Sequence, residues 1–319
     1  MKHVPHNEVA ADVFRSGLDS YERILFHGAG GWFGKTAISL LNPAELSSGR
    51  FRFVGRTTRE ERINGASIKI EGWSDSILEE FAPDAVLDFA FLTKNRMQTV
   101  GQKVFNQVNL ELSNRLFTIA RFHSVKFIFS TSSGAAEEAF TESGTSNTDN
   151  YASQKRTNEI ALRQISHEQN KKVAIARPWS VSGGFVGNPE DYAFSDFVLS
   201  ALRSGTIKLH STHLVHRRYC AVEDLLALTI AGAVHENFSI LDSGGKLIEL
   251  RDLAREIADE IGGSITIFEH PSRTSSDSDN YFSDNQSWLR LCEEHSFEPL
   301  DLRQQISNVV AALYQKLRG

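Results

Sequence analysis

The sequence predicts an α/β fold built on a doubly wound parallel sheet and followed by a smaller C-terminal lobe. Short apolar segments alternate with helical segments from residue 23 to about residue 178, which is typical of a parallel sheet with helices on both faces. The segments "RILFHG" and "KFIFS" are almost continuously apolar, as expected of strands buried on both sides. A glycine-rich turn follows the first strand, where such sheets bind ligands.

Each element of the first part is predicted from its own pattern. Strands are expected where apolar and β-branched residues cluster, and helices where apolar residues recur at helical spacing. The predicted strands are 23–28, 50–56, 66–72, 84–91, 125–133 and 172–179, and the helices are 33–42, 108–123 and 151–166.

The pattern changes after residue 179. The segment 180–192 is rich in glycine and turn residues, and helices are predicted at 194–205 and 250–263, each ended by glycine. The polar segment 271–287 is predicted to be a loop. We therefore expect an N-terminal extension, a dinucleotide-binding domain with a returning segment, and a second lobe made of two pieces: 1–22, 23–178 with a return near 214–243, and 179–213 with 244–319.

Composition excludes several classes of protein. The net charge of −6 gives no reason to expect a nucleic-acid partner. The two cysteines, Cys220 and Cys292, are far apart, which favours a reducing compartment without structural zinc. No apolar segment approaches the ~20 residues that span a bilayer, and no signal-peptide pattern begins the sequence. We expect a cytoplasmic protein without a membrane partner.

The glycine turn "ILFHGAGGWFG" indicates a cofactor. Gly28, Gly31 and Gly34 have the spacing GxxGxxG between a strand and a helix. In a Rossmann-type sheet this turn lets the backbone approach a dinucleotide pyrophosphate at the helix N-terminus. A tight turn without ligand is the alternative interpretation.

The end of the second strand indicates which dinucleotide binds. An acidic residue there would bind the 2′-hydroxyl of NAD, but this sequence reads "FVGRTTRE", with Arg56 in that place. An arginine can pair with a 2′-phosphate, so NADP is favoured and NAD remains possible. A solvated surface arginine is the alternative.

Two further segments carry acid–base chemistry. In "YASQK", Tyr151 and Lys155 are four residues apart and share a helix face, and a nearby ammonium lowers the pKa of a tyrosine. The strand "FIFSTSSG" ends in hydroxyls that include Ser132 and Ser133, where ligands bind in parallel sheets. Surface pairing of Lys155 and turn capping by serine are the alternatives.

Together these segments resemble the extended short-chain dehydrogenase/reductase family, in its nucleotide-sugar epimerase/dehydratase group. The resemblance covers roughly residues 23–310. It rests on the glycine turn, "DAVLDFA", Asn109, "FIFSTSS", "YASQKRTNE", "ARPWSVSGG" and "RRYCAVEDL".

The resemblance implies roles for individual residues. It implies Ser132 as the hydroxyl that orients the substrate, Tyr151 as acid/base and Lys155 as the group that lowers the tyrosine pKa and holds the nicotinamide ribose. Ser133 is the substitute if the register differs by one, and Arg217, with Arg218 as neighbouring candidate, is implied to bind a nucleotide diphosphate. The implied cofactor-binding residues are Gly28, Gly31, Gly34, Trp32, Phe33, Arg56, Ala90, Lys155 and Pro178.

Departures from the family pattern reduce the number of reactions to be considered. Ser133 and Gly134 stand where the 4,6-dehydratases carry an Asp–Glu pair, which argues against a dehydratase. The three histidines of "LHSTHLVHRRY" alternate faces on a strand, so no metal is expected.

These observations favour NADPH-dependent reduction of a 4-keto nucleotide sugar, with Ser132 holding the carbonyl oxygen. One alternative is a nucleotide-sugar 4-epimerase with tightly bound NAD, which would use the same three residues. An alternative of another class is a non-catalytic dinucleotide-binding sensor. The family resemblance also implies a homodimer.

Overall fold

The computed structural model describes residues 8–138, 150–233, 236–272 and 278–318. The chain forms two compact units. We call them the sheet unit, Ala10–Pro178 with Leu226–Leu241, and the C-terminal unit, the described part of Met1–Val9 with Trp179–Leu225 and Asp242–Gly319.

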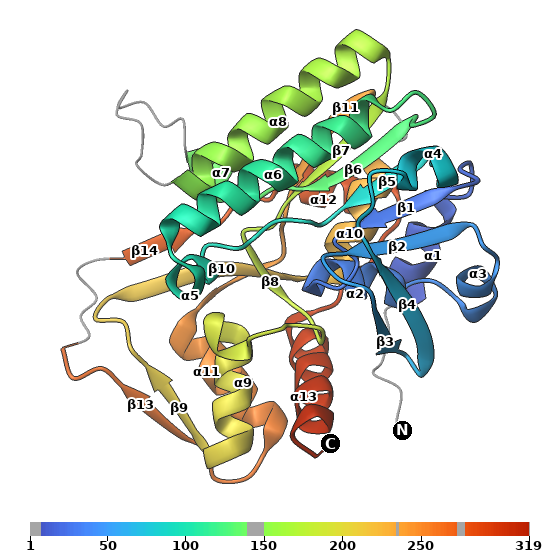
Figure 1. The fold of residues 1–319 in the computed structure, drawn as a ribbon. Helices are drawn as coiled ribbons and strands as arrows, with labels where there is room; N and C mark the ends of the chain where they lie inside the picture. Colours follow the sequence, from blue (N-terminus) through green and yellow to red (C-terminus); the bar gives the residue numbers. More distant parts are fainter. Residues whose placement is uncertain (1–7, 139–149, 234–235, 273–277, 319) are drawn as a thin grey trace. The chain divides into compact units, whose positions relative to one another are not determined.

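The sheet unit is built on an eight-stranded sheet (Figure 1). Its strand order is β11-β7-β6-β5-β1-β2-β4-β3. Every pairing from β7 through β4 is parallel, and β3 is antiparallel to β4. The strands are β1 Ile24–His27, β2 Phe51–Gly55, β3 Arg59–Ile63, β4 Ala66–Gly72, β5 Ala85–Asp88, β6 Phe127–Thr131, β7 Lys172–Arg177 and β11 Phe238–Asp242.

The order of the parallel strands locates the binding edge. The chain moves outward from β1 through β2 to β4, then returns to β5 on the other side of β1 and continues to β6 and β7. Ligands of doubly wound sheets bind beyond the carboxyl ends of the strands where this order reverses. That point is the pair β1 and β5, and the glycine turn follows β1 directly.

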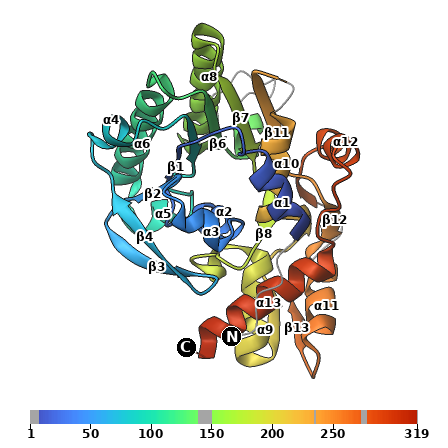
Figure 2. The same cartoon turned by 90° about the vertical axis from the view of Figure 1, so that its right-hand side faces the viewer.

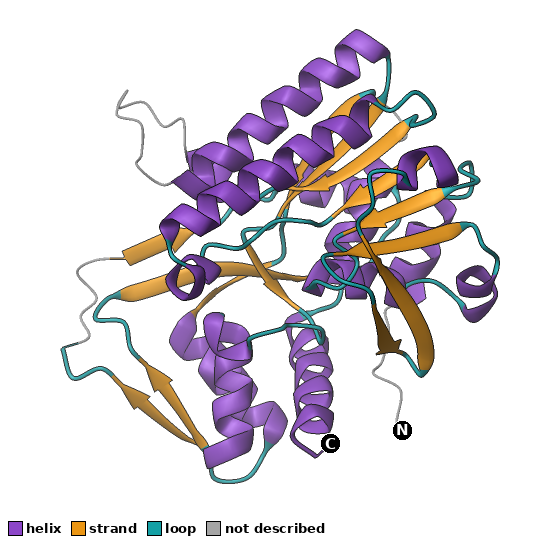
Figure 3. Cartoon of the chain, in the orientation of Figure 1, coloured by secondary structure: helices purple, strands orange, loops and turns teal. Residues whose placement is uncertain are grey.

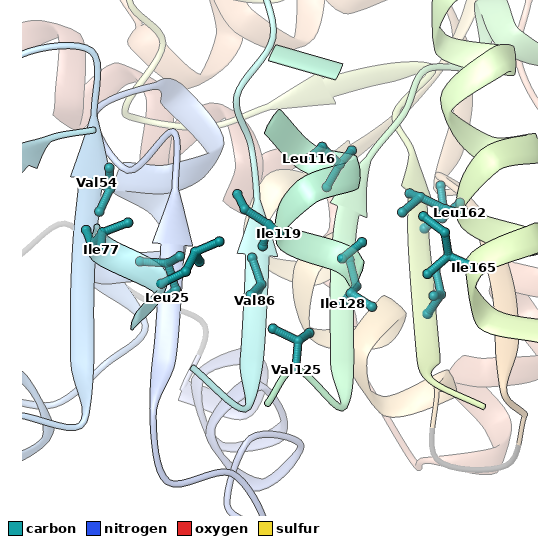
Figure 4. Packing of buried hydrophobic residues seen from close by; sticks show 14 residues of the cluster. Leu25, Val54, Ile77, Val86, Leu116, Ile119, Val125, Ile128, Leu162 and Ile165 are labelled. Carbon is teal, nitrogen blue, oxygen red and sulfur yellow. The ribbon is translucent and has the colours of Figure 1, made fainter. Parts of the chain in front are cut away.

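Helices cover both faces of the sheet (Figure 2). On one face, side chains of α4, α6 and α8 pack against Leu25, Val86 and Ile128 of the central strands (Figure 4), and α2 lies on the other face. The helices that belong wholly to this unit are α2 Trp32–Ser39, α3 Pro43–Ser47, α4 Ile77–Phe81, α5 Arg96–Val100, α6 Gln102–Arg121, α7 Ala135–Glu138 and α8 Asn150–Gln169. Two helices, α1 Glu8–Ser16 and α10 Val222–Gly232, each have residues in both units.

The C-terminal unit has smaller sheets. Strand β10 pairs with β12, β14 and β8, and β9 pairs with β13. Helix α13 packs against α9 and α11. The elements are β8 Ser180–Ser182, the 3₁₀ turn Pro189–Asp191, α9 Ala193–Ser204, β9 Thr206–Leu209, β10 Leu214–Ala221, β12 Lys246–Glu249, α11 Leu250–Ile261, β13 Thr266–Glu269, β14 Ser278–Tyr281, α12 Gln286–Glu294 and α13 Leu302–Arg318.

The predicted α/β fold with a parallel sheet is confirmed, and the strands and helices of the first part lie where the patterns place them. One strand of the sheet was not predicted, and one prediction is wrong in part. Strand β3 forms a hairpin with β4 at the edge of the sheet (Figure 3), and part of the predicted loop 271–287 is strand β14, because it pairs with β10. None of the described helices has the length and apolar character of a membrane span.

Candidate active site

Two glycines of the turn after β1 are required by the fold itself. Gly28 has a φ of +82°, and a Cβ there would lie 2.6 Å from the backbone nitrogen of Ala90. A Cβ on Gly34 would lie 2.6 Å from the carbonyl oxygen of Gly28. Both contacts are with backbone, so any side chain would force the turn, β5 and α2 apart. This places the backbone of Ala90 directly against the turn.

Gly31 is different, because residues other than glycine could also adopt its backbone conformation. It is the N-cap of α2 with φ of −82°, and a Cβ there would meet, among the described residues, only the Gly28 carbonyl oxygen at 3.4 Å. It provides no side-chain cap for the helix that Trp32 and Phe33 begin. A helix N-terminus without a side-chain cap leaves backbone N–H groups that can bind a pyrophosphate group.

Cationic side chains gather beside this turn. Arg56 follows β2 and is exposed. Arg59, which the sequence analysis did not single out, lies over the turn: a Cβ on Gly30 would be 1.7 Å from its Nη2. Glu61 accepts hydrogen bonds from Arg59 Nε at 2.8 Å and Lys35 Nζ at 2.9 Å.

The charge of this cluster is positive. Burial would raise the pKa of Glu61, but the hydrogen bonds from Arg59 and Lys35 outweigh it and lower that pKa. Glu61 is therefore an ionised carboxylate shared by two cations. Arg59 and Lys35 thus share this one anion, and Arg56 adds an exposed cation after β2. The signal in the sequence that could have pointed to Arg59 is its place three residues after Arg56, in "RTTR".

The hydroxyls after β6 have separate partners. Ser132 Oγ donates to Glu159 Oε1 at 2.5 Å, and Ser133 Oγ accepts from the Ala135 backbone nitrogen at 3.3 Å at the start of α7. Thr131 Oγ1 is buried and has no hydrogen-bond partner among the described residues. Pro178 lies beside this segment, since its carbonyl oxygen accepts from the Gly134 backbone nitrogen at 2.9 Å.

Tyr151 and Lys155 lie against one aromatic ring. The Phe91 ring makes an edge contact with Tyr151, at 5.8 Å between centroids, and Lys155 Nζ lies 3.8 Å from its centroid. Lys155 Nζ also donates to the Thr131 carbonyl oxygen at 2.7 Å. The structure thus brings the predicted lysine to the end of β6 and places the predicted tyrosine against the same Phe91 ring.

Lys155 is a buried cation. Burial lowers the pKa of its ammonium to about 8, against the opposing effects of the Asp88 and Glu159 carboxylates. An ammonium that has lost most of its water interacts strongly with a neighbouring phenolate.

An acidic group beneath this cluster was missed by the sequence analysis. Asp88 ends β5, where its Oδ1 lies 2.6 Å from His27 Nδ1, and Ser130 Oγ donates to its Oδ2 at 3.4 Å. The pair is buried. The predicted family residue Asn109 is also buried, and its side chain exchanges two hydrogen bonds with the backbone of Leu92.

The two arginines of β10 are held in the C-terminal unit. Arg217 Nη2 donates to Asp279 Oδ2 at 2.7 Å and Arg217 Nη1 to Asp279 Oδ1 at 3.2 Å. Hydrogen bonding to Arg217 lowers the pKa of Asp279. Arg218 donates to the carbonyl oxygens of Ser283 and Gly245, so its guanidinium serves the local fold.

No cluster of metal-ligating side chains occurs in the described ranges. What the sheet unit offers instead is a proton-transfer group, a buried cation and a glycine turn at one edge of a parallel sheet. This set can hold a dinucleotide and move a proton at a hydroxyl or carbonyl oxygen.

Solved structures of known enzymes share this fold. A UDP-N-acetylglucosamine 4-epimerase from Methanobrevibacter ruminantium, in complex with UDP-N-acetylmuramic acid, has a TM-score of 0.72 and 17% identity over 92% of this chain and 99% of that one. A UDP-glucose 4-epimerase from Brucella ovis in complex with NAD has a TM-score of 0.68 and 17% identity, with coverage of 91% and 98%. A dTDP-glucose 4,6-dehydratase from Streptomyces venezuelae with NAD bound has a TM-score of 0.68 and 19% identity, and the match covers 93% of this chain and 98% of that one.

The sequence itself gives a family match. No curated protein sequence matches this chain. Residues 24–239, however, match the family model described as the NAD dependent epimerase/dehydratase family. Because this match spans more than half of the chain and includes the glycine turn, the strand-end serines and the Tyr151–Lys155 helix, the protein belongs to the NAD-dependent epimerase/dehydratase family of enzymes.

Proposed function

We propose that this protein is an NADP(H)-dependent oxidoreductase that reduces a 4-keto nucleotide sugar. The observation that carries the proposal is the buried Lys155 ammonium, held between the Thr131 carbonyl oxygen and the Phe91 ring that also contacts Tyr151. A cation buried in this way serves proton transfer more directly than it serves stability, because burying it is costly.

The cofactor would be held by the edge of the sheet unit. The glycine turn and the first residues of α2 suit the pyrophosphate, and Ala90, Pro178 and Lys155 line the approach to β5, β6 and β7. When bound, the nicotinamide would supply the hydride. The residues proposed for cofactor binding are Gly28, Gly31, Gly34, Trp32, Phe33, Arg56, Arg59, Ala90, Lys155 and Pro178.

The preference for NADP rests on charge. Arg56 and Arg59 follow β2, and Lys35 lies opposite them across Glu61. A 2′-phosphate would meet an excess of cations there, and arginine forms bidentate hydrogen bonds with phosphate. The 2′-hydroxyl of NAD would lack the carboxylate that usually binds it, because Glu61 is already shared by two cations.

Tyr151 is proposed to transfer the proton of the reaction. In this proposal the Lys155 ammonium favours the phenolate form of Tyr151 during the transfer. Ser132 is proposed to hydrogen-bond the oxygen at the reacting carbon, and Ser133 is less suited because its hydroxyl serves α7.

The C-terminal unit is proposed to be the substrate-binding lobe. The structures with this fold include enzymes solved with UDP-N-acetylmuramic acid and with UDP-glucose, which supports a nucleotide-linked sugar here. Arg217 is the proposed diphosphate-binding residue. Since Asp279 pairs with it, a diphosphate would have to displace that carboxylate.

A 4-epimerase with retained NAD is the second candidate. Three of the similar structures are UDP-glucose 4-epimerases solved with NAD. Such an enzyme would need the same Tyr151 and Lys155, but it would consume no cofactor.

Mass spectrometry of the nucleotide released from the denatured protein separates the two candidates. NADP, or an empty protein that binds NADPH and consumes it with a 4-keto nucleotide sugar, is the expected result. Retained NAD, together with interconversion of UDP-glucose and UDP-galactose without added cofactor, would replace the reductase by the epimerase. Full activity of Tyr151→Phe in either assay would contradict both.

A homodimer and a cytoplasmic location complete the proposal. Apolar side chains are exposed on the neighbouring helices α6 and α8, namely Val104, Leu110 and Ile160, and a second copy of the chain would cover them. Both cysteines are free thiols, as is usual in a reducing compartment.

A further inference from the structure

One carboxylate behind the serine at the end of β6 receives an unusual number of hydrogen bonds. Glu159 lies on α8, one turn after Lys155, and is 2% exposed. Arg177 donates to both of its oxygens at 2.7 Å, Arg156 donates to Oε2 at 3.0 Å, and Ser132 donates to Oε1 at 2.5 Å. The carboxylate is thus bound by four donor atoms.

These partners keep Glu159 ionised. Burial would raise the pKa of Glu159, but hydrogen bonds from Arg177 and Ser132 outweigh it and hold the pKa below its ordinary value. An ionised carboxylate can only accept hydrogen bonds. The short contact with Ser132 therefore has one possible direction, in which the serine hydroxyl gives its single proton to Glu159.

The direction of this bond fixes what Ser132 offers to a ligand. A hydroxyl has one proton and two lone pairs, so a serine that donates to Glu159 presents only acceptor positions elsewhere. Its backbone is also fixed, because the Ser132 nitrogen donates to the Ala176 carbonyl oxygen at 2.7 Å. Ser132 is 5% exposed, so a water molecule has little room to replace Ser132 as the hydrogen-bond donor to Glu159.

We propose that Glu159 is a positioning residue that holds Ser132 as a hydrogen-bond acceptor, so that Ser132 binds the hydroxyl form of the reacting group and not its carbonyl form. The inference rests on the proposed function, and it corrects the expectation that Ser132 holds the carbonyl oxygen. A carbonyl oxygen can only accept, and two acceptors do not bind one another. In this proposal Tyr151 is the donor to the carbonyl.

The hydrogen-bond direction is tested without any substrate in Ser132→Cys. A thiol beside an ionised carboxylate resists ionisation, so its pKa, read from thiolate absorbance after subtraction of the unsubstituted protein, is expected at least one unit above the ordinary value of about 8.5. Adding Glu159→Gln is expected to lower it by about one unit or more. An equal thiol pKa in both proteins would overturn the proposal.

Glu137→Gln is the matched control. Glu137 pairs with the same guanidinium of Arg177 but has 57% of its side chain exposed and does not contact Ser132. Glu137→Gln makes the same chemical change at a carboxylate that does not contact Ser132, and we expect this substitution to leave the thiol pKa unchanged. A shift as large as that of Glu159→Gln would assign the effect to the loss of a charge opposite Arg177.

The consequence for binding is tested by comparing KM for the hydroxyl and keto forms of the sugar. Removing one hydrogen bond costs about tenfold in affinity. Glu159→Gln is expected to raise KM about tenfold for the hydroxyl form and to leave KM for the keto form unchanged or lower. Adding Ser132→Ala should abolish this selectivity without further loss. Equal changes for both forms would show a merely structural role.

Two outcomes of these experiments remain distinct. If the unsubstituted protein converts no nucleotide sugar, the proposed function fails, while the thiol titration still decides the role of Glu159. If Glu159→Gln does not fold, Glu159→Asp keeps a charge opposite Arg177 but withdraws the oxygen from Ser132, and the same lowering of the thiol pKa is expected.

Discussion

At the scale of single residues, Lys155 shows how function opposes stability. Its ammonium is buried, donates one hydrogen bond to a backbone carbonyl and lies over the Phe91 ring. The lowering of its pKa from 10.5 to about 8 corresponds to roughly 3 kcal/mol by which folding disfavours the charged form. The fold tolerates this cost at the position where the proposed function requires a cation beside Tyr151.

Lys155→Met should therefore stabilise the protein while abolishing activity. At pH 7 the gain is expected to be roughly 1–3 kcal/mol, because the lost bond to Thr131 offsets part of it. The folded-state pKa lies below the unfolded one, so the unfolded chain binds more protons between pH 8 and 10.5 and the stability of the unsubstituted protein rises there. The advantage of Lys155→Met should shrink over the same range.

Urea denaturation without cofactor, at several pH values, measures this difference. Lys126→Met is the control, since Lys126 is exposed and its replacement should change little at any pH. If the two lysine variants gave the same stability curve, the buried cation would carry no cost.

In the proposed function, the cations after β2 select the cofactor, which is also a matter of single residues. Arg56→Ser and Arg59→Ser are each expected to weaken NADPH binding about tenfold or more, because a charge-assisted hydrogen bond to phosphate is lost. Binding of NADH should be nearly unaffected. Fluorescence titration with both nucleotides measures the ratio, and Arg52→Ser serves as control because Arg52 pairs with Glu71. An unchanged ratio in both variants would remove the case for NADP.

At the scale of elements, the glycine turn contains two kinds of glycine. Gly34→Ala is expected to destabilise the protein by about 1–3 kcal/mol, since its Cβ would overlap the Gly28 carbonyl oxygen. Gly31→Ala meets only ordinary contact, so it should keep the thermal stability but bind dinucleotide about tenfold or more weakly. Thermal unfolding and cofactor titration of both variants test this contrast. Unchanged binding by a folded Gly31→Ala would mean that no phosphate approaches the turn.

Strands that form only through pairing with a distant segment were not predicted from the sequence. The residues of β14, "SDNY", are polar and follow serines, a composition typical of loops, and they form a strand only because β10 offers backbone groups to pair with. Likewise β3, "REERI", is strongly charged and is strand because β4 lies antiparallel to it. The buried strands β1 and β6 were predictable because continuous apolar residues at such length specify burial by themselves.

At the scale of the whole molecule, the exposed apolar side chains of α6 and α8 predict the assembly. Leu110→Glu with Ile160→Glu should convert a dimer into a monomer, because charges would be buried without partners in the interface. Light scattering after size-exclusion chromatography measures the mass. Leu289→Glu is the control, since Leu289 is equally exposed but lies on α12. A monomeric unsubstituted protein would contradict the homodimer at once.

The sequence by itself determined the fold class, and it predicts the cofactor turn and the Tyr151–Lys155 pair. Each of these depends on patterns close in the chain: apolar runs, a glycine spacing, and a four-residue helical interval. The role of Ser132 is implied by the family resemblance, and the site residues stay predictions. The tertiary structure decided what those groups touch. The bond from Ser132 to Glu159, Arg59 over Gly30, and Asp279 on Arg217 all join segments far apart in sequence. The direction of a hydrogen bond and the balance of charge follow from such long-range contacts, and these contacts cannot be predicted from a local sequence pattern.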